Sequence, residues 1–241
     1  MRLDRFLANQ AYGSRSEARR LIRSGKITVN GRTAQDESMQ INPSADQISC
    51  LGQAIRYREF IYLMLHKPAG VVSATVDGRE RTVLDLIDPK YRHKNLFPVG
   101  RLDKDTEGLL ILTNHGALGH QLLAPKQHVP RQYYAKVEGM VSTADQEAFR
   151  NGILLEDGYR TLPAELEIIK KGENSGGSCS EVTVVLREGK YHQIKRMFQA
   201  LGKRVVYLKR TAMGDLRLDP ALQPGEYREL TDEELEILRC R

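Results

Sequence analysis

The sequence predicts an α+β protein, in which a small basic module of two helices and a hairpin precedes a larger domain on a mixed, mostly antiparallel sheet. Apolar residues recur at helical spacing near the N-terminus, and short apolar runs broken by turn residues follow from residue 60. Residues 1–32 hold eight Lys and Arg against two Asp and Glu, which accounts for the whole net charge of +6. We therefore expect a module over residues 1–59 and a domain over residues 60–241.

The module is predicted from its periodicity and its turn residues. Apolar residues repeat at helical spacing from Leu3, and Gly13 ends that run. Ser14 or Ser16 can cap a second helix. The pair Asn30-Gly31 follows an alternating segment and is a strong signal for a two-residue hairpin turn. The module therefore reads as helix, helix, hairpin.

The second helix carries a stripe of cations. Arg15, Arg19, Arg23 and Lys26 are spaced so that they fall on one side of this helix, away from its apolar residues. Such a stripe can follow a phosphate backbone, although a merely solvated helix face is the alternative. A helix lying on a membrane surface would need a longer apolar face with large side chains. We therefore expect these four residues to bind nucleic acid.

The larger domain is predicted as a mixture of strands and short helices. Apolar runs and turn signals place the strands at 61–65, 71–73, 134–137 and 181–186, and helices at 83–87, 116–123 and 193–201. Gly202 ends the last helix. Strands and helices do not alternate regularly, which argues against a doubly wound parallel sheet.

The densest group of acids lies in the segment 99–110. Asp103, Asp105 and Glu107 occupy alternate positions between two glycines, as in a calcium-binding loop. The twelfth position of such a loop would be Asn114, which cannot supply the bidentate carboxylate that calcium sites use there. A turn in which these acids pair with nearby basic residues is the structural alternative, and chemistry at a carboxylate is the functional one.

A second polar segment runs from Glu188 to Phe198. It places His192, Gln193 and Lys195 at the start of a helix, after a glycine turn. Aromatic, amide and cationic groups of this kind suit a flipped base and its phosphate. A basic amphipathic helix with a buried apolar side would give the same pattern, and the two interpretations are compatible.

Other classes of function find little support. The histidines lack metal-ligand or triad spacing, and no glycine-rich phosphate loop or dinucleotide fingerprint is present. The three cysteines form no C-x-x-C pair, as expected for reduced thiols. No apolar run is long enough for a membrane span and no signal peptide is seen. We expect a cytoplasmic protein without metal or cofactor.

The N-terminal segment resembles the S-four RNA-binding module. The resemblance rests on Arg2-Leu3-Asp4, on Ser14-Arg15-Ser16-Glu17-Ala18, and on Ile27-Thr28-Val29-Asn30-Gly31. Members of this family bind structured RNA by shape and by phosphate contacts. The resemblance therefore implies that the basic stripe is an RNA-binding surface.

Over nearly its whole length, the chain resembles the RsuA branch of the pseudouridine synthases. The motifs that carry the resemblance are Gly100-Arg101-Leu102-Asp103, Arg131-Gln132-Tyr133, Gly189 to Met197 and Val205 to Arg210. Three catalytic residues are implied by it, namely Asp103, Tyr133 and Lys195. It also implies that Arg101 enters the RNA and that Leu208 packs beneath the target base, while His192 and Gln193 contact RNA. Relatives often have Lys-Thr at positions 131–132 and arginine at position 195.

This resemblance implies an α+β catalytic domain of the pseudouridine synthase type, which isomerises uridine in ribosomal RNA. The small-subunit RNA is favoured, with large-subunit RNA as the alternative. A noncatalytic RNA-binding factor of ribosome assembly is the other alternative, but pure binding gives no reason for Asp103, Tyr133 and Lys195 to occur together. The implied partner is ribosomal RNA or a pre-ribosomal particle, bound by a monomer.

Overall fold

The structure is a computed structural model that describes residues 1–10, 12–55, 57, 59–174 and 177–239. The chain forms two compact units. The first comprises residues 1–61 with the short pieces 87–97 and 113–115, and the second contains the rest of the described chain. Among the described residues, every helix is too short or too polar to cross a bilayer.

In the first unit, two helices pack on a small sheet. Helix α1 (Leu3–Asn9) precedes α2 (Arg15–Arg23), and the sheet has the order β2-β1-β3-β4. Its strands are β1 Ile27–Val29, β2 Arg32–Thr33, β3 Ile48–Cys50 and β4 Gln53–Ala54. The prediction of helix, helix and hairpin is confirmed.

Local contacts explain why these elements form. The hydroxyl of Ser14 accepts a hydrogen bond from the Glu17 amide, while the Glu17 carboxylate accepts one from the Ser14 amide, so α2 begins with a capping box. Asn30 and Gly31 have φ values of 51° and 78°, the left-handed conformations that a tight hairpin requires. Apolar side chains of both helices, such as Phe6 and Ile22, are buried against the sheet.

The second unit is built on a long sheet with the order β13-β5-β7-β11-β8-β10-β9. Strand β11 runs parallel to β7 and antiparallel to β8, and the pairs β8·β10, β10·β9 and β13·β5 are antiparallel. The strands on this path are β5 Tyr62–Lys67, β7 Glu107–Thr113, β8 Arg131–Glu138, β9 Glu165–Asn174, β10 Gly177–Leu186, β11 Arg204–Met213 and β13 Tyr227–Glu229. A mixed, mostly antiparallel sheet is confirmed.

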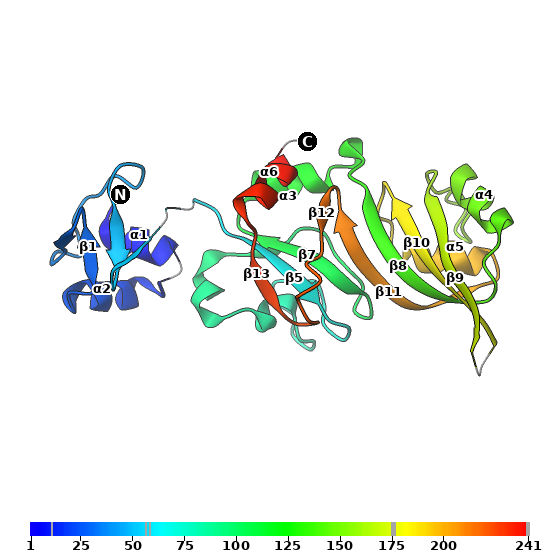
Figure 1. Cartoon of the computed structure of the whole chain (residues 1–241), viewed down its shortest axis with the longest axis horizontal. Coiled ribbons are helices and arrows are strands. Elements are labelled where there is room, and N and C mark those ends of the chain that lie inside the picture. The colour runs from blue at the N-terminus through cyan, green and yellow to red at the C-terminus, as the bar shows by residue number, and fades with distance from the viewer. Residues whose placement is uncertain (11, 56, 58, 175–176, 240–241) are drawn as a thin grey trace. The chain divides into compact units, whose positions relative to one another are not determined.

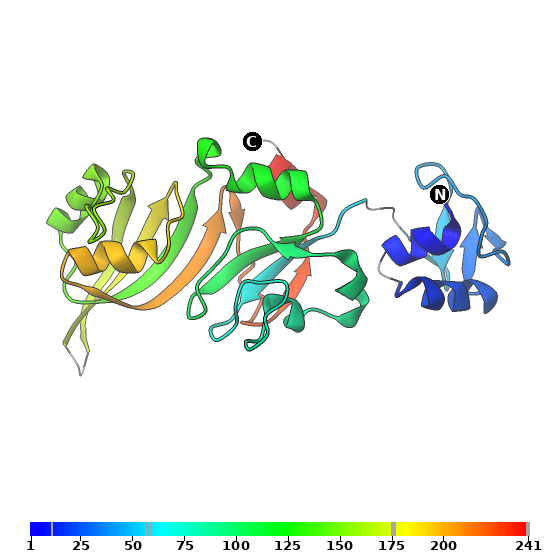
Figure 2. The same cartoon turned by 180° about the vertical axis from the view of Figure 1, so that it is seen from behind.

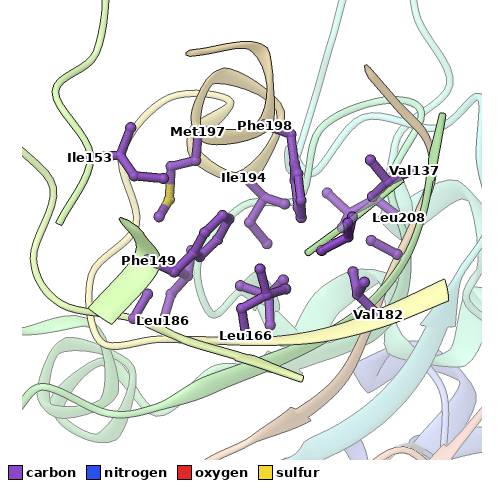
Figure 3. Packing of buried hydrophobic residues seen from close by; sticks show 14 of the residues in the cluster. Val137, Phe149, Ile153, Leu166, Val182, Leu186, Ile194, Met197, Phe198 and Leu208 are labelled. Atoms are coloured by element: carbon purple, nitrogen blue, oxygen red, sulfur yellow. The ribbon is translucent and has the colours of Figure 1, made fainter. Parts of the chain in front are cut away.

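Two helices cover one face of this sheet over β8, β10 and β9, namely α4 (Thr143–Asn151) and α5 (Gln193–Ala200) (Figures 1 and 2). Figure 3 shows Ile194, Met197 and Phe198 of α5 facing strand residues such as Val182. The rings of Phe149 and Phe198 lie 5.0 Å apart, so the two helices share one core. This packing fixes α5 beside the sheet.

The remaining elements are short. Strand β6 (Phe97–Pro98) pairs with β7, and β12 (Leu216–Arg217) pairs with β11. The helices and 3-10 turns are η1 Val83–Leu86, η2 Pro89–Lys94, α3 Gly116–Leu123, η3 Pro125–Gln127 and α6 Asp232–Arg239.

Sequence and structure agree on most elements of the larger domain but differ at some. The helix predicted at 116–123 is confirmed as α3, and the helix at 193–201 is confirmed within one residue as α5. The strand predicted at 71–73 is wrong, because Val72 forms only a single bridge, with Thr82. The helix predicted at 83–87 is a 3-10 turn.

Candidate active site

A cavity of about 630 Å³ in the second unit brings together residues that are far apart in the sequence. Its walls come from the loop 100–106, from one face of strands β8, β10 and β11, and from the turn that leads into α5. Six of the residues singled out from the sequence line it and come from all four motifs, namely Arg101, Asp103, Tyr133, His192, Gln193 and Leu208. The fold therefore gathers the predicted motifs around one concave site.

Backbone constraints hold the loop 100–106 in place. Gly108 of β7 pairs with Arg210 of β11 at φ +108°, and any Cβ at this position would collide with the Arg210 backbone. Glycine is therefore required where the two strands meet. At the start of the loop, the Ser73 hydroxyl accepts a hydrogen bond from the Leu102 amide at 3.1 Å and donates one to the Leu102 carbonyl at 3.0 Å.

Beneath the loop lies the fully buried Lys67, which the sequence patterns did not single out. The Lys67 ammonium donates hydrogen bonds to the carbonyl oxygens of Pro68 at 2.9 Å, Thr106 at 2.8 Å and Lys104 at 3.3 Å. Burial lowers its pKa to about 8, against the smaller opposing effect of nearby acids, including Asp103. Lys67 thus ties the end of β5 to both sides of the turn that follows Asp103.

Asp103 faces a lysine that comes from α5. The Lys195 Nζ atom lies 3.1 Å from Asp103 Oδ2 and 2.6 Å from Asp105 Oδ1. Burial alone would lower the Lys195 pKa, but hydrogen bonds with Asp105 and Asp103 outweigh it and raise that pKa above its ordinary value. The lysine therefore remains a cation at neutral pH, next to the Asp103 carboxylate.

Asp105 also contacts Lys195, although the family resemblance implies no chemical role for it. Its hydrogen bond with Lys195 lowers its pKa, against the raising effect of burial, and its side chain is 72% exposed. His192 is the other neighbour, with Nε2 3.6 Å from Asp103 Oδ1, and its ring stacks on Tyr191 at 3.8 Å. Asp103 thus has a cation on one side and an imidazole on the other.

The face of the sheet supplies the remaining wall. Tyr133 of β8 pairs with Arg210 of β11, and Ala135 pairs with Leu208, so these side chains lie on one face of the sheet. Leu208 is buried at 6% exposure and, like Tyr133, lines the cavity. An aromatic ring and an aliphatic side chain next to a carboxylate can hold a flat base that has left its stack.

One residue that we expected to contact RNA is buried and makes hydrogen bonds within the protein. Gln193 is 4% exposed; its amide nitrogen donates to Glu188 Oε1 at 2.7 Å, and its amide oxygen accepts from the Lys190 backbone at 2.9 Å. Because both ends of the amide are occupied, Gln193 shapes the turn before α5. Gln193 also lines the cavity, and its contact with RNA stays a prediction.

The four predicted cations lie in the first unit, three of them on α2 and Lys26 after its end, and two of them have acidic partners. Arg19 Nε donates to the buried Asp4 carboxylate at 3.0 Å, and Arg23 pairs with Glu37 at 3.4 Å. Asp4 and Glu37 come from segments outside α2, so the spacing of the stripe could not reveal these pairs. Arg15 and Lys26 are exposed at the surface.

The three acids of the alternative calcium loop have other partners in the structure. Asp103 and Asp105 contact the Lys195 ammonium, and Glu107 accepts a hydrogen bond from the Tyr207 hydroxyl at 2.7 Å. Within the described ranges, no three His, Cys, Asp or Glu side chains are grouped so that they could hold a metal ion. The three acids do not converge on one point, as a calcium loop would require.

Comparisons of the sequence and the structure find similar proteins among the RNA pseudouridine synthases. The RNA pseudouridylate synthase family matches residues 61–200, and the S-four domain matches residues 1–47. The chain is 49% identical over 238 residues to an RNA pseudouridine synthase of Bacillus subtilis, YtzG, with 99% of this chain and 98% of that one covered. It is 39% identical over 240 residues to ribosomal small subunit pseudouridine synthase A of Vibrio cholerae, with 98% of each chain covered. A crystal structure of a pseudouridylate synthase shares 37% identity with a TM-score of 0.68 and covers 99% of both chains.

Proposed function

The chain belongs to the RNA pseudouridylate synthase family, and from this premise we propose that it isomerises a uridine of small-subunit ribosomal RNA to pseudouridine. The observation that carries the proposal is Asp103, which lines a cavity with Tyr133 and Leu208 and has the Lys195 ammonium 3.1 Å from its carboxylate. The small-subunit substrate is supported by relatives of that name, which align with nearly the whole chain.

The reaction breaks the bond between ribose C1′ and uracil N1, turns the base, and joins C1′ to C5. A proton leaves C5 and N1 gains one, so no oxidant or reductant is needed. Asp103 acts as the nucleophile or base that starts the cleavage, and the Lys195 cation lies next to its carboxylate. Tyr133 stacks on the flipped base and Leu208 packs beneath it, while Arg101, which is exposed at the rim, takes the place of the base in the RNA.

The first unit supplies RNA affinity. Its S-four domain carries Arg15, Arg19, Arg23 and Lys26 on or next to α2, where they can contact phosphates. We expect the protein to act as a monomer in the cytoplasm, on ribosomal RNA or a pre-ribosomal particle.

The test compares ribosomal RNA with and without the protein. Pseudouridine is mapped in both ribosomal RNAs from a strain that lacks the gene, and the purified protein is then added to each unmodified RNA. We expect one small-subunit position to be unmodified in the deletion strain and to be restored by the purified protein. A missing position in large-subunit RNA would replace the proposed substrate, and no change in either RNA would favour a noncatalytic assembly factor.

A further inference from the structure

Two arginines on strands that form the cavity wall have no role in the mechanism described above. Arg131 and Arg210 project from the same sheet face as Tyr133, because Arg131 lies two residues before Tyr133 on β8 and Arg210 pairs with Tyr133 across β11. Both line the cavity. They lie close enough for the charge of Arg210 to act on the pKa of Arg131. Two like charges next to each other are unfavourable unless an anion joins them.

Arg210 is one of the most deeply buried side chains, at 2% exposure. Its Nε donates to the Leu109 carbonyl at 2.8 Å, but the buried Nη2 atom has no hydrogen-bond partner among the described residues. A buried guanidinium nitrogen without a partner is costly, since buried polar groups are nearly always hydrogen-bonded. Thr106, which also lines the cavity, has a buried hydroxyl in the same condition.

Arg131 also lacks a carboxylate among the charged neighbours that act on its pKa. Burial is the main cause that lowers its pKa, and the charged neighbours that act on it are Tyr133 and Arg210, neither of which is a carboxylate. Besides Asp103, the acid that lines the cavity is Glu188, which already accepts hydrogen bonds from Tyr159, the Leu162 amide and Gln193. The positive charge of the two arginines is therefore left for a ligand.

We propose that Arg131 and Arg210 hold the detached uracil as an anion between cleavage of the N1 bond and formation of the C5 bond. The proposal rests on the proposed function. When the C1′–N1 bond breaks, its electron pair stays on uracil, and the negative charge spreads over N1 and the carbonyl oxygens. A free N–H of Arg210 and the guanidinium of Arg131 donate to these acceptors, and the Thr106 hydroxyl donates a further hydrogen bond.

Burial favours the base over an RNA phosphate as the occupant. Arg101, Arg187 and Lys190 are exposed cations of the cavity and suit a backbone that stays in solvent. Arg210, in contrast, lies next to Tyr133, where the flipped base stacks, and has almost no contact with solvent. A fixed cation in such a place stabilises developing charge far better than water does.

The test compares how fast each variant reacts with two target nucleosides, whose bases differ in how readily they leave as anions. Arg131→Met, Arg210→Lys and Arg210→Met are assayed in single turnover with RNA carrying uridine or 5-fluorouridine at the target, because fluorine makes the released base a more stable anion. With uridine, Arg131→Met and Arg210→Met should be about 100-fold slower, the usual loss when one preorganised donor is removed from developing charge. With 5-fluorouridine, measured as loss of the fluorouridine nucleoside, the defect should be smaller, and Arg210→Lys should lie between wild type and Arg210→Met.

Arg204→Met is the matched control, since it removes a cation from the same strand outside the cavity, where Arg204 is 74% exposed and pairs with Glu138. It should react like wild type. If Arg210→Met does not fold, as checked by circular dichroism, Arg131→Met alone decides. Equal defects on the two substrates, or a loss of RNA affinity in place of rate, would overturn the proposal and assign the pair to a phosphate. If wild type forms no pseudouridine, the proposed function itself fails.

Discussion

The cations of α2 and the cations around the cavity differ in what surrounds them. On α2, Arg15 is exposed and Arg19 is bound by a carboxylate. In the second unit, Lys67 is fully buried and donates to three carbonyl oxygens, and Arg210 is buried with one nitrogen that finds no partner in the described part of the chain. Exposed charges are screened by salt and contribute mostly to affinity, whereas buried charges keep their strength and their direction. We therefore expect changes on α2 to alter binding and changes at the cavity to alter rate or folding.

The largest effect in this comparison is expected from Lys195→Met. Loss of the ammonium 3.1 Å from Asp103 should slow isomerisation about 100-fold or more, as removal of a preorganised charge does in other enzymes. RNA affinity should change little. Lys195→Arg should keep much of the rate because it keeps the charge. Single-turnover rates at saturating RNA measure this, and a wild-type rate in Lys195→Met would show that Asp103 works without the cation.

Tyr133→Phe should reduce turnover more than affinity, because the ring still stacks while the hydroxyl near the reacting atoms is lost. The expected loss in rate is roughly 10- to 100-fold, the effect of one hydrogen bond to a charged group. Tyr133→Leu should weaken both rate and binding. Equal turnover by wild type and Tyr133→Phe would remove the hydroxyl from the mechanism.

Lys67→Met should lower the free energy of unfolding by about 1–3 kcal/mol, because carbonyl oxygens beneath the loop lose their donor. The pKa of Lys67 is lowered to about 8 in the folded state, from 10.5. Between these two values the unfolded chain binds more protons than the folded one, so this group adds stability as pH rises. Denaturant unfolding from pH 7 to 10.5 should show wild type gaining stability relative to Lys67→Met. A pH-independent difference would contradict the assigned pKa.

The smallest effects are expected from substitutions of the cations on or next to α2. Arg15→Gln and Lys26→Gln should each reduce the slope of log Kd against log salt concentration by about 0.7 to 0.9, with turnover at saturating RNA unchanged. Arg19→Gln should also destabilise the protein, because the buried Asp4 loses one of its two arginine partners. An unchanged salt slope in both Arg15→Gln and Lys26→Gln would show that the stripe does not contact phosphate.

Sequence patterns predicted the parts of the fold that depend on local chemistry. The Ser14 cap, the turn at Asn30-Gly31 and helix α3 follow from residues that are close in the chain. The strand predicted at 71–73 was wrong, since apolar residues alone do not provide a partner strand.

The site was predicted only in part, and the missing part depends on long-range pairing. Asp103 and Lys195, both of which the family resemblance implied to be catalytic, lie in contact. The contacts of Lys67 with a loop far along the chain and the neighbouring positions of Arg131 and Arg210 could not be read from spacing. A register shift between Arg210 and Ala212 brings Arg210 opposite Tyr133, and nothing in the local sequence marks that shift.

The measurement that tests the account most directly is single-turnover pseudouridine formation by Asp103→Asn on prefolded RNA, with Kd measured in parallel. Asp105→Asn is the matched control, since it changes a second carboxylate that contacts Lys195. We predict that Asp103→Asn binds RNA with wild-type affinity and forms no pseudouridine, because an amide is a poor nucleophile and base, while Asp105→Asn still forms it. Substantial pseudouridine formation by Asp103→Asn would contradict the account.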